Sequence, residues 1–577
     1  MYTISMNPVD YFRHPKLEWQ RRYEALRASF LDRLPAKVVA QQFNYSSGYI
    51  TLLRHLFTTG KLDLAEPVPE GKANRSRVSA ATRAKIREYR DADLSSGEIA
   101  ELLNEDGVEI SVRTVERVLR EEGYKKLPRR TRLKMAVTVK GANVPEKSTR
   151  ISIGEIGEQR FVSEHAGIYL FAPFLSQFDW DSVVKHAVLP GSKIIPAKNY
   201  LLSFIALKLL GMERFAHAGD YSFDSALGLF AGLNVLPKCT ALSTYSYSLD
   251  EVNILRLQES FVKQAQRLHL YDGNVVNLDF HTIPHYGDES VLEKNWAGAR
   301  GKVMKGVLSL IAQDSESRLM LYTAADIQRS EANDQVYAFM KFWKSVYRGV
   351  SPTLVFDSKF TDYCHLSGLN RQNIKFITLR RRGDGLIGKL EQITDWRRIT
   401  IPHPKRTFPN PQVYESTTTL RNYDGLVRQV VIRGNGHEKP AFLITNDFDT
   451  GLELLVGTYA RRGRVENGIA EAVKFFHLNA LSSPILIKVH FDVAMTMIAD
   501  TIYTMLAKQL RGFEECNAQT IYRNFVKGKG TVAVEDGQIN VAYPRRAHNP
   551  ILRNINWSNF PLNVPGCPGA ALNLTFA

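Results

Sequence analysis

The sequence predicts a multidomain protein in which all-α helix-turn-helix units are followed by an α/β domain that carries a β-rich insertion. Three observations lead to this prediction. The chain has 577 residues, several times the usual size of a domain. Its first 140 residues contain short amphipathic segments separated by turn residues. From residue 271 the pattern changes to short apolar runs that alternate with helical ones, which is typical of an α/β sheet.

The composition is that of a basic globular protein. There are 75 Lys and Arg against 59 Asp and Glu, for a net charge of +16 and a pI near 9.4, which favours a polyanionic partner such as double-stranded DNA. The four cysteines form no CxxC pair, so neither a disulfide framework nor a zinc knuckle is indicated. We expect a cytoplasmic, nucleoid-associated protein without a membrane partner, because the N-terminus lacks an apolar signal region and the most apolar stretch carries Asp500.

The first helical unit is predicted from "PAKVVAQQFNYSSGYITLLRHLF". A short helix is followed by a turn around Asn44, and Ser46 is a suitable N-cap for a second helix. Ile50, Leu53 and Leu56 keep helical spacing on that second helix, so they define its buried face. A helix, a tight turn and a second helix are the geometry of a helix-turn-helix.

A second unit follows a polar break near residues 66–78. Its last helix starts at Ser111, and its apolar stripe is Val112, Val115, Val118 and Leu119. The side chains predicted to face outward, toward a DNA groove and its phosphates, include Arg113, Thr114 and Arg117. Residues 1–140 hold 26 Lys and Arg against 18 Asp and Glu. We therefore expect a DNA-binding region here, with a plain helical bundle carrying solvated arginines as the alternative.

Residues 141–270 are predicted to form a mostly helical linking or assembly region, and residues 271–382 the first part of the α/β domain. In the latter, "GNVVNLDF" is a short buried strand predicted to stop on Asp279. A β-hairpin and an amphipathic helix follow. The next strand, in "SPTLVFDSKF", is predicted to end on Asp357, and "IKFITLRRR" contains one more strand. Residues just past neighbouring strand ends point into a common crevice, so we expect Asp279 and Asp357 to lie together.

Two neighbouring aspartates repel each other unless a cation lies between them. Oxygen ligands without clustered Cys or His favour Mg²⁺ or Mn²⁺, and a third acid would complete a site for two ions. "YARRGRVENGIAEAVKFFHL" supplies a candidate, Glu466, on a helix with a predicted packing stripe of Val465, Ile469, Ala472, Val473 and Phe476. Glu466 lies at the edge of this stripe, so it can reach toward both aspartates.

The remaining segments are assigned by composition. Residues 383–450 are rich in Pro, Gly and β-formers, which predicts a β-rich insertion, and residues 451–512 complete the α/β domain with the Glu466 helix. Residues 513–577 are assigned to a C-terminal tail region. Within the insertion, Trp396 is expected to pack in a core, with stacking on a displaced DNA base as the alternative.

These motifs together resemble the DDE transposases of bacterial insertion sequences, which have an RNase H-like catalytic domain. "NLDFHTIPHYGD", "LVFDSKFTDY" and "YARRGRVENG" carry the resemblance, which covers most of the chain. The last of them is similar to the branch with a Tyr-Arg-Glu signature, since Tyr459, Arg462 and Glu466 fall in its register. Lys474 stands one residue beyond the position of the signature lysine, and Phe280 follows the first acid where relatives often have a small residue.

The resemblance implies a metal-dependent transposase that cuts DNA at transposon ends and joins them to target DNA. Asp279, Asp357 and Glu466 would be the catalytic metal ligands for two Mg²⁺ or Mn²⁺ ions. Tyr459, Arg462 and Lys474 would contact DNA, in a homodimer or higher oligomer, and the β-rich insertion would help to hold the cut end. A DNA-binding regulator with an inactive nuclease-like domain and a metal-dependent endonuclease without strand transfer are the alternatives.

Several residues have a competing interpretation. Asp279 and Asp357 could be ordinary turn caps. The rival carboxylates are Asp288, Asp447, Glu453 and Glu471, of which Glu471 is the nearest rival for the third position. His281 and His285 have a spacing from Asp279 that raises the possibility of zinc, but without an evident fourth ligand a loop or DNA-contact role is favoured. Arg380, Arg381 and Arg382 are either a solvated run or DNA contacts.

Overall fold

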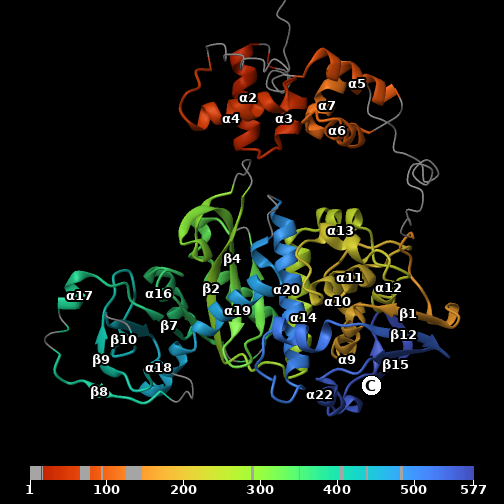
Figure 1. Ribbon diagram of the computed structural model, residues 1–577. Coiled ribbons are helices and arrows are strands. Elements are labelled where there is room, and N and C mark those ends of the chain that lie inside the picture. Colours follow the sequence, from red (N-terminus) through yellow and green to blue (C-terminus); the bar gives the residue numbers. More distant parts are fainter. Residues whose placement is uncertain are drawn as a thin grey trace, which may run out of the picture. The chain divides into compact units, whose positions relative to one another are not determined.

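The computed structural model describes residues 15, 17–64, 78–91, 95–124, 146–286, 292–325, 327–347, 349, 351–388, 390, 393–401, 408–436, 439–480 and 485–577. Figure 1 shows the chain coloured along its sequence. It divides into two compact units, Met1–Ala142 and Asn143–Ala577. The first unit is helical where it is described, and the second combines helices with two sheets, so the chain is a multidomain α/β protein.

The first helices that the structure describes in this unit are α2 (Glu18–Phe30), α3 (Ala36–Gln42) and α4 (Ser47–Thr58). They share a small apolar core that includes Ile50 and Leu53. Ser46 caps α4 as predicted, because its hydroxyl accepts a hydrogen bond from the Tyr49 N–H at 3.1 Å. Leu56 is only partly buried.

Three further helices have a core of their own, α5 (Ala80–Asp91), α6 (Ser96–Glu105) and α7 (Val112–Glu121). Ser111 caps α7, and Val115, Val118 and Leu119 are buried as predicted. The prediction for Val112 was wrong, because this first helical residue precedes the packed turns and is 46% exposed.

The outward residues of α7 have different surroundings. Arg113 is exposed, and Arg117 lies 3.8 Å from Glu121 along the same helix face. The Thr114 hydroxyl is 2.9 Å from the hydroxyl of the cap residue Ser111. Arg113 is therefore presented freely to solvent, while Thr114 and Arg117 have local partners.

The second unit opens with a helical part (Figure 1). Its elements are η1 (Ile153–Glu155), η2 (Ala166–Phe171), α9 (Ala172–Leu175), α10 (Trp180–His186), α11 (Ala197–Leu209), η3 (Phe215–Tyr221), α12 (Ser225–Phe230), α13 (Cys239–Tyr245), η4 (Ser246–Ser248) and α14 (Glu251–Arg267). Asp250 and Asn253 form a capping box at the start of α14. The side chain of Gln258 on α14 exchanges two hydrogen bonds with the backbone of Thr323, which ties this helical part to the large sheet.

The large sheet has the order β3-β4-β2-β6-β7-β11-β10-β9-β8, and β5 pairs with β4. Its first strands are β2 (Val275–Pro284), β3 (Lys294–Ala297), β4 (Lys302–Asp314), β5 (Met320–Ala324), β6 (Thr353–Phe356) and β7 (Phe376–Leu379). β2 runs antiparallel to β4 and parallel to β6, which is parallel to β7. The predicted hairpin is confirmed as β4 and β5, and the predicted helices are confirmed as α15 (Gln335–Val346) and α16 (Tyr363–Arg371).

The prediction that the first strand stops on Asp279 was wrong. β2 continues to Pro284 because the long strand β4 pairs with it from Val276 to Pro284. The parallel pairing with β6 ends earlier, at Leu278 opposite Phe356. Asp279 is therefore the first residue of β2 beyond the end of β6, and Asp357 is the first residue after β6.

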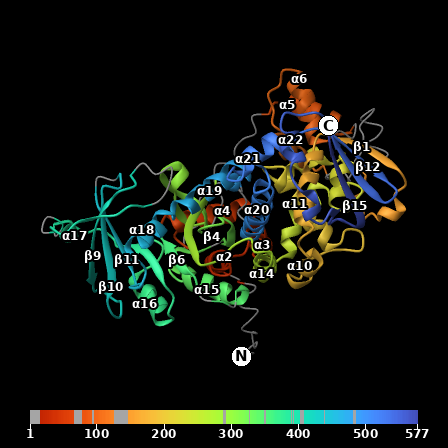
Figure 2. The same ribbon diagram turned by 90° about the horizontal axis from the view of Figure 1, so that it is seen from below.

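The insertion extends the large sheet past β7. It contains α17 (Asp384–Gly388), β8 (Arg397–Arg398), β9 (Gln412–Thr418), β10 (Val427–Arg433) and β11 (Ala441–Thr445), which pair antiparallel, with β11 joined to β7. Together with α18 (Leu452–Ala460), it encloses a second apolar core that also contains Val355 and Ile377. Figure 2 shows β9, β10 and β11 continuing from the sheet, with α18 beside them.

Residues 513–577, assigned to a tail, are folded. They contain α21 (Ala518–Ile521), a π-helical turn (Tyr522–Val526), β12 (Gly530–Glu535), β13 (Gln538–Tyr543), α22 (Asn549–Arg553), η10 (Trp557–Asn559), β14 (Asn563–Val564) and β15 (Cys567–Phe576). With β1 (Gln159–Ser163) they make a second sheet of order β1-β12-β13-β15-β14. Gly232 and Gly566 allow this segment to dock, since a Cβ on Gly232 would stand 2.0 Å from the Gly566 carbonyl oxygen.

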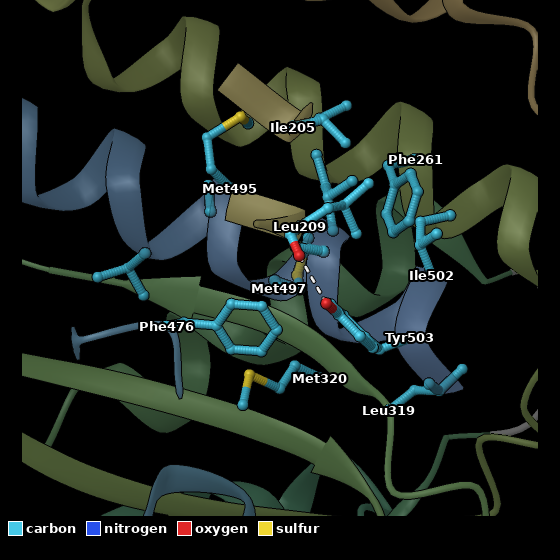
Figure 3. Close-up of a cluster of buried hydrophobic side chains, with 14 of the residues drawn as sticks. Ile205, Leu209, Phe261, Leu319, Met320, Phe476, Met495, Met497, Ile502 and Tyr503 are labelled. Atoms are coloured by element: carbon cyan, nitrogen blue, oxygen red, sulfur yellow. Dashed lines mark hydrogen bonds between the residues drawn. The ribbon is translucent and has the colours of Figure 1, made fainter. Parts of the chain in front are cut away.

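The core of the second unit forms around α20 (Leu486–Ala507), which packs against β5, α11 and α14. Figure 3 shows Tyr503 of α20 pointing at α11, where its hydroxyl donates to the Leu209 carbonyl at 2.5 Å. Phe476, at the end of α19 (Gly463–Phe475), enters the same cluster. Within the described residues, no helix has the length and apolar character needed to cross a membrane.

Candidate active site

Two aspartates meet on the central strands of the large sheet. Asp279 and Asp357 each follow the last residue pair of the parallel β2–β6 ladder, so they are neighbours across strands that lie about 4.8 Å apart. The backbone N–H of Phe280 donates to Asp279 Oδ1 at 3.0 Å. The N–H of Ser358 donates to Asp357 Oδ1 at 2.6 Å. Both carboxylates are thereby oriented by the backbone that follows them.

Aromatic packing joins the two segments that carry these acids. The rings of Phe280 and Phe360 stack with centroids 4.6 Å apart and an angle of 19°. Side chains alternate along a strand, so the Phe280 ring lies on the opposite face of β2 from Asp279. The large residue after the first acid therefore leaves the site open and holds the two segments together.

The third acid comes from helix α19, which packs on β2 and β4. Its buried face is formed by Val465, Ile469, Ala472 and Phe475, with Phe476 buried at its C-terminal end. The predicted stripe was wrong at Val473, which is only partly buried, because Phe475 takes the inward position. Glu466 lies in the first turn, where the helix dipole favours an acid, and its side chain is 54% exposed.

Arg462 connects two of the three acids. Its guanidinium lies 2.7 Å from Glu466 Oε1 and 4.0 Å from Asp279 Oδ2, and the side chain is only 18% exposed. The guanidinium carbon is also 6.0 Å from the ring centroid of Tyr459, one helical turn earlier. The structure thus brings together Asp279, Asp357, Tyr459, Arg462 and Glu466.

The electrostatics of Asp279 reflect this gathering of charge. The pKa of Asp279 is raised to about 6, chiefly by burial; the nearby carboxylates of Glu466 and Asp357 act in the same direction, and the Arg462 guanidinium opposes them. Burial also raises the pKa of the Tyr459 hydroxyl to about 12, with Asp357 and Glu466 acting in the same direction. The group therefore holds an excess of negative charge that a cation would stabilise.

The donor set suits a hard divalent cation. Three carboxylates offer the oxygen ligands that Mg²⁺ and Mn²⁺ prefer, and Asp279 and Asp357 are already oriented by backbone hydrogen bonds. As they stand, no three His, Cys, Asp or Glu side chains of the described residues converge closely enough to enclose one ion. Arg462 lies where that convergence would occur, in contact with Glu466 and near Asp279.

A basic hollow adjoins Asp357. It has a volume of about 530 Å³ and is lined by Ser358, Lys359, Arg381 and Arg382. The Arg381 guanidinium donates to the Ser358 carbonyl at 3.2 Å, which brings the end of β7 against the residue after the second acid. Such a surface attracts a phosphodiester backbone. Lys359 was not predicted, although its position two residues after Asp357 is a usable signal.

Two predicted DNA contacts lie away from the three acids. Arg380 turns to the insertion, where its guanidinium donates to Gln429 Oε1 at 2.7 Å. Lys474 is exposed in the last turn of α19. Burial raises the pKa of Glu471, and the charges of Arg318 and Lys474 partly offset this rise. Their binding to DNA remains a prediction.

The structure gives three of the four rival carboxylates surroundings other than the cluster of Asp279, Asp357 and Glu466. Glu471 faces α20, where its charge adds to the burial that raises the pKa of Asp500 to about 7. Asp447 is buried and accepts hydrogen bonds from the Thr450 hydroxyl and backbone, and from Lys375. These bonds outweigh burial and lower the pKa of Asp447 to about 2. Glu453 is exposed in the first turn of α18, and Asp288 lies outside the described residues.

Of the two histidines, His281 lies in β2 and His285 directly follows Pro284, the last residue of the strand. His281 Nε2 is 2.7 Å from Asn479 Oδ1, in the short helix η8 (Leu478–Ala480), and burial lowers the pKa of His281. His285 is 8% exposed. His281 lies within β2, so the prediction of a loop position was wrong for His281, whereas His285 follows the strand; a DNA contact stays a prediction for both. Within the described residues, no group of three His, Cys, Asp or Glu side chains is arranged to hold a metal ion.

Trp396 belongs to neither described apolar core of the second unit. It is partly buried, and the Arg433 guanidinium lies 3.8 Å from the centroid of its ring. The preferred prediction of core packing was therefore wrong: Trp396 directly precedes β8, a two-residue strand at the edge of the sheet.

No protein-family model matches the chain, and no curated protein is similar to it. Among solved structures, the chain is similar to a piggyBac transposase synaptic complex with hairpin DNA, with a TM-score of 0.35, 12% identity, and coverage of 64% of this chain and 82% of that chain. It is also similar to a Mos1 strand transfer complex, with a TM-score of 0.13, 12% identity, and coverage of 64% and 78%. Scores this low do not establish a shared fold, so the geometry of the site carries the functional conclusion.

Proposed function

We propose that the protein is a DDE transposase that cuts DNA at transposon ends and joins them to target DNA in a cut-and-paste reaction. The observation that carries this proposal is the meeting of Asp279 and Asp357 on adjacent strands with Arg462 and Glu466 of α19. The mixed strand order β5-β4-β2-β6-β7, with the acids on the central pair, supports an RNase H-like catalytic domain.

The carboxylate oxygens of Asp279, Asp357 and Glu466 are the donor type that Mg²⁺ and Mn²⁺ prefer, and these three acids would hold two such ions. When bound, such ions activate an attacking oxygen and stabilise the leaving one in a displacement at phosphorus. The chain supplies the positioning. Arg462 would bind a phosphate with its planar guanidinium, and Tyr459 would support that arginine and line the DNA strand.

The flanking surfaces would hold the DNA. Lys359, Arg381 and Arg382 form the basic hollow beside Asp357, which suits the sugar-phosphate backbone next to the bond that is cut. Trp396, stacked with Arg433 on the insertion, would offer its partly exposed ring to a base. The helices of residues 1–140, through Arg113, Thr114 and Arg117, would recognise the ends, with a homodimer or larger assembly pairing two of them.

One observation favours a second candidate, a DNA-binding regulator whose nuclease-like domain is inert. Arg462 already neutralises part of the acidic cluster, through Glu466 at 2.7 Å. A domain that has lost its metals would keep such an ion pair as a permanent structural feature. The two candidates differ in whether the site cuts DNA.

The test is incubation of the purified protein with DNA carrying its own flanking ends, in Mg²⁺ or in EDTA, beside Glu466→Ala and Glu453→Ala. We expect metal-dependent cleavage and joining in the wild type, at least a hundredfold loss in Glu466→Ala with end binding retained, and normal activity in the exposed control Glu453→Ala. Binding of the ends without cleavage would favour the regulator, and cleavage without joining would favour an endonuclease.

A further inference from the structure

The counter-ion of the acidic cluster is part of the chain itself. Arg462 is the residue whose guanidinium pairs with Glu466 at 2.7 Å and approaches Asp279 at 4.0 Å. Among the described residues, no other Lys or Arg forms an ion pair with Asp279, Asp357 or Glu466. Arg462 thus lies at the place where the donor set of the three acids would receive a cation.

A guanidinium and a divalent cation cannot use the same carboxylate oxygens. An ion bound to Glu466 needs the oxygen that now accepts from Arg462, and like charges in a half-buried site repel each other. The present contacts differ in strength, since the approach to Asp279 is at the limit of an ion pair and Glu466 is largely exposed. The arrangement therefore neutralises the acids and yet can be displaced.

A second partner for Arg462 is available in the proposed reaction. A phosphodiester can accept two parallel hydrogen bonds from a planar guanidinium. In the present contact, Arg462 donates one hydrogen bond to a single oxygen of Glu466. The basic hollow beside Asp357 would bring the DNA backbone to this side of the cluster. DNA therefore offers Arg462 a better partner at the moment when the acids need a metal.

We propose that Arg462 competes with the divalent cation for Glu466 and Asp279, and that DNA relieves this competition by taking Arg462 onto a phosphate. Metal affinity then depends on DNA, and the protein without DNA is held in a weakly metallated state. This inference rests on the proposed function, because it assumes that the three acids bind metal. By linkage, metal also strengthens DNA binding by the same factor.

The test measures Mn²⁺ binding to the full chain without DNA, by the loss of the free Mn²⁺ signal in electron paramagnetic resonance. Arg462→Gln is compared with Arg461→Gln. The control removes the same charge from the neighbouring position, where Arg461 pairs with Glu316 and with none of the three acids. We expect roughly tenfold tighter Mn²⁺ binding in Arg462→Gln, little change in Arg461→Gln, and an intermediate result in Arg462→Lys. Circular dichroism checks that each variant is folded.

The acids are tested in the same assay, so that the two proposals can fail separately. Asp279→Ala and Asp357→Ala should abolish Mn²⁺ binding both in the wild type and in Arg462→Gln. If they do and Arg462→Gln binds like the wild type or more weakly, the competition is overturned and the metal site stands. If Mn²⁺ does not bind, or binds independently of these acids, both the proposed function and the competition are overturned.

A second arm adds a short duplex oligonucleotide, with a DNA-only titration subtracted. DNA should tighten Mn²⁺ binding by the wild type roughly tenfold more than by Arg462→Gln, because only the wild type has an arginine to transfer. An equal effect of DNA in both proteins would overturn the transfer of Arg462 to a phosphate.

Discussion

At the scale of single residues, the ionised carboxylates of the candidate site lower the free energy of unfolding. Asp279 is desolvated by burial and lies near two further carboxylates, so its ionised form is unfavourable in the folded protein. Asp447 is also buried, yet hydrogen bonds from Thr450 and Lys375 favour its ionised form. The two aspartates therefore affect folding in opposite directions.

Asp279→Asn should abolish cleavage and stabilise the metal-free protein. The pKa of Asp279 is raised from 3.8 to about 6, so the native state loses stability as pH rises from about 4 to 6 and does not regain it above. At pH 7.5 the substitution should raise the free energy of unfolding by roughly 1–3 kcal/mol, and below pH 4 the difference should vanish. Urea unfolding in EDTA measures this.

Asp447→Asn is the matched control with the opposite sign. The pKa of Asp447 is lowered to about 2, so its contribution is present above about pH 4 and is lost as pH falls through 2. The substitution should destabilise the protein by roughly 1–3 kcal/mol at pH 7.5. Equal signs for the two variants would contradict this account.

His365 should make stability depend on pH near neutrality. Burial lowers the pKa of His365, but hydrogen bonds to Asp362 at 2.7 Å and Asp334 at 2.9 Å outweigh it and raise the pKa above 6.5. The contribution is complete below that ordinary value and is lost as pH rises through the raised one. His365→Gln should cost less than about 1 kcal/mol at pH 5.5 and show a smaller deficit at pH 8; a constant deficit would refute the ion pairs.

At the scale of elements, helix α19 is held at both ends. Its start carries Arg462 and Glu466 over the strand ends, and its last turn leads to Phe476, whose carbonyl accepts from Lys208 Nζ at 3.2 Å. Lys208 also pairs with Asp492 of α20 at 2.7 Å, and both side chains are buried. Helix α19 is thereby fixed to α11 and α20.

Lys208→Met should remove this attachment. It leaves the Asp492 carboxylate buried without its partner, which should lower the free energy of unfolding by about 3–5 kcal/mol. Chemical denaturation measures the change. The double variant Lys208→Met/Asp492→Leu should recover most of the loss, because neither charge then remains in the core; no recovery would show that the pair does not act as a unit.

At the scale of the whole molecule, the two units have separate cores. The main core draws on residues from Ala166 onward, and the cores of the first unit draw only on residues of that unit. In the second unit, segments far apart in the sequence pair in one sheet, because β1 near the start of the unit pairs with β12 near the C-terminus. Folding of the second unit therefore requires almost its full length.

Residues 143–577 produced alone should fold. Among the described residues, none of the buried apolar side chains of their core comes from the first unit, so the thermal midpoint should lie within a few degrees of that of the full chain. Footprinting should show loss of preference for the element's ends while weak, salt-sensitive DNA binding remains. Failure of this fragment to unfold cooperatively would show that the first unit contributes to its stability.

Local patterns were sufficient for much of the fold. The hairpin β4–β5, the helices α15 and α16 and the strand before Asp357 follow from short-range periodicity, which depends on neighbours a few residues apart. The extent of β2 could not be predicted in this way, because its continuation to Pro284 is set by pairing with β4.

The sequence by itself determined the candidate acids and the signature around Glu466, since residue types at strand ends and in one helix turn are local information. Only the tertiary structure decided that Arg462 joins Glu466 and approaches Asp279, that Glu471 faces Asp500, and that Gln159 pairs with Val534 in one sheet. These contacts depend on packing between distant segments, for which no short window of sequence carries a signal.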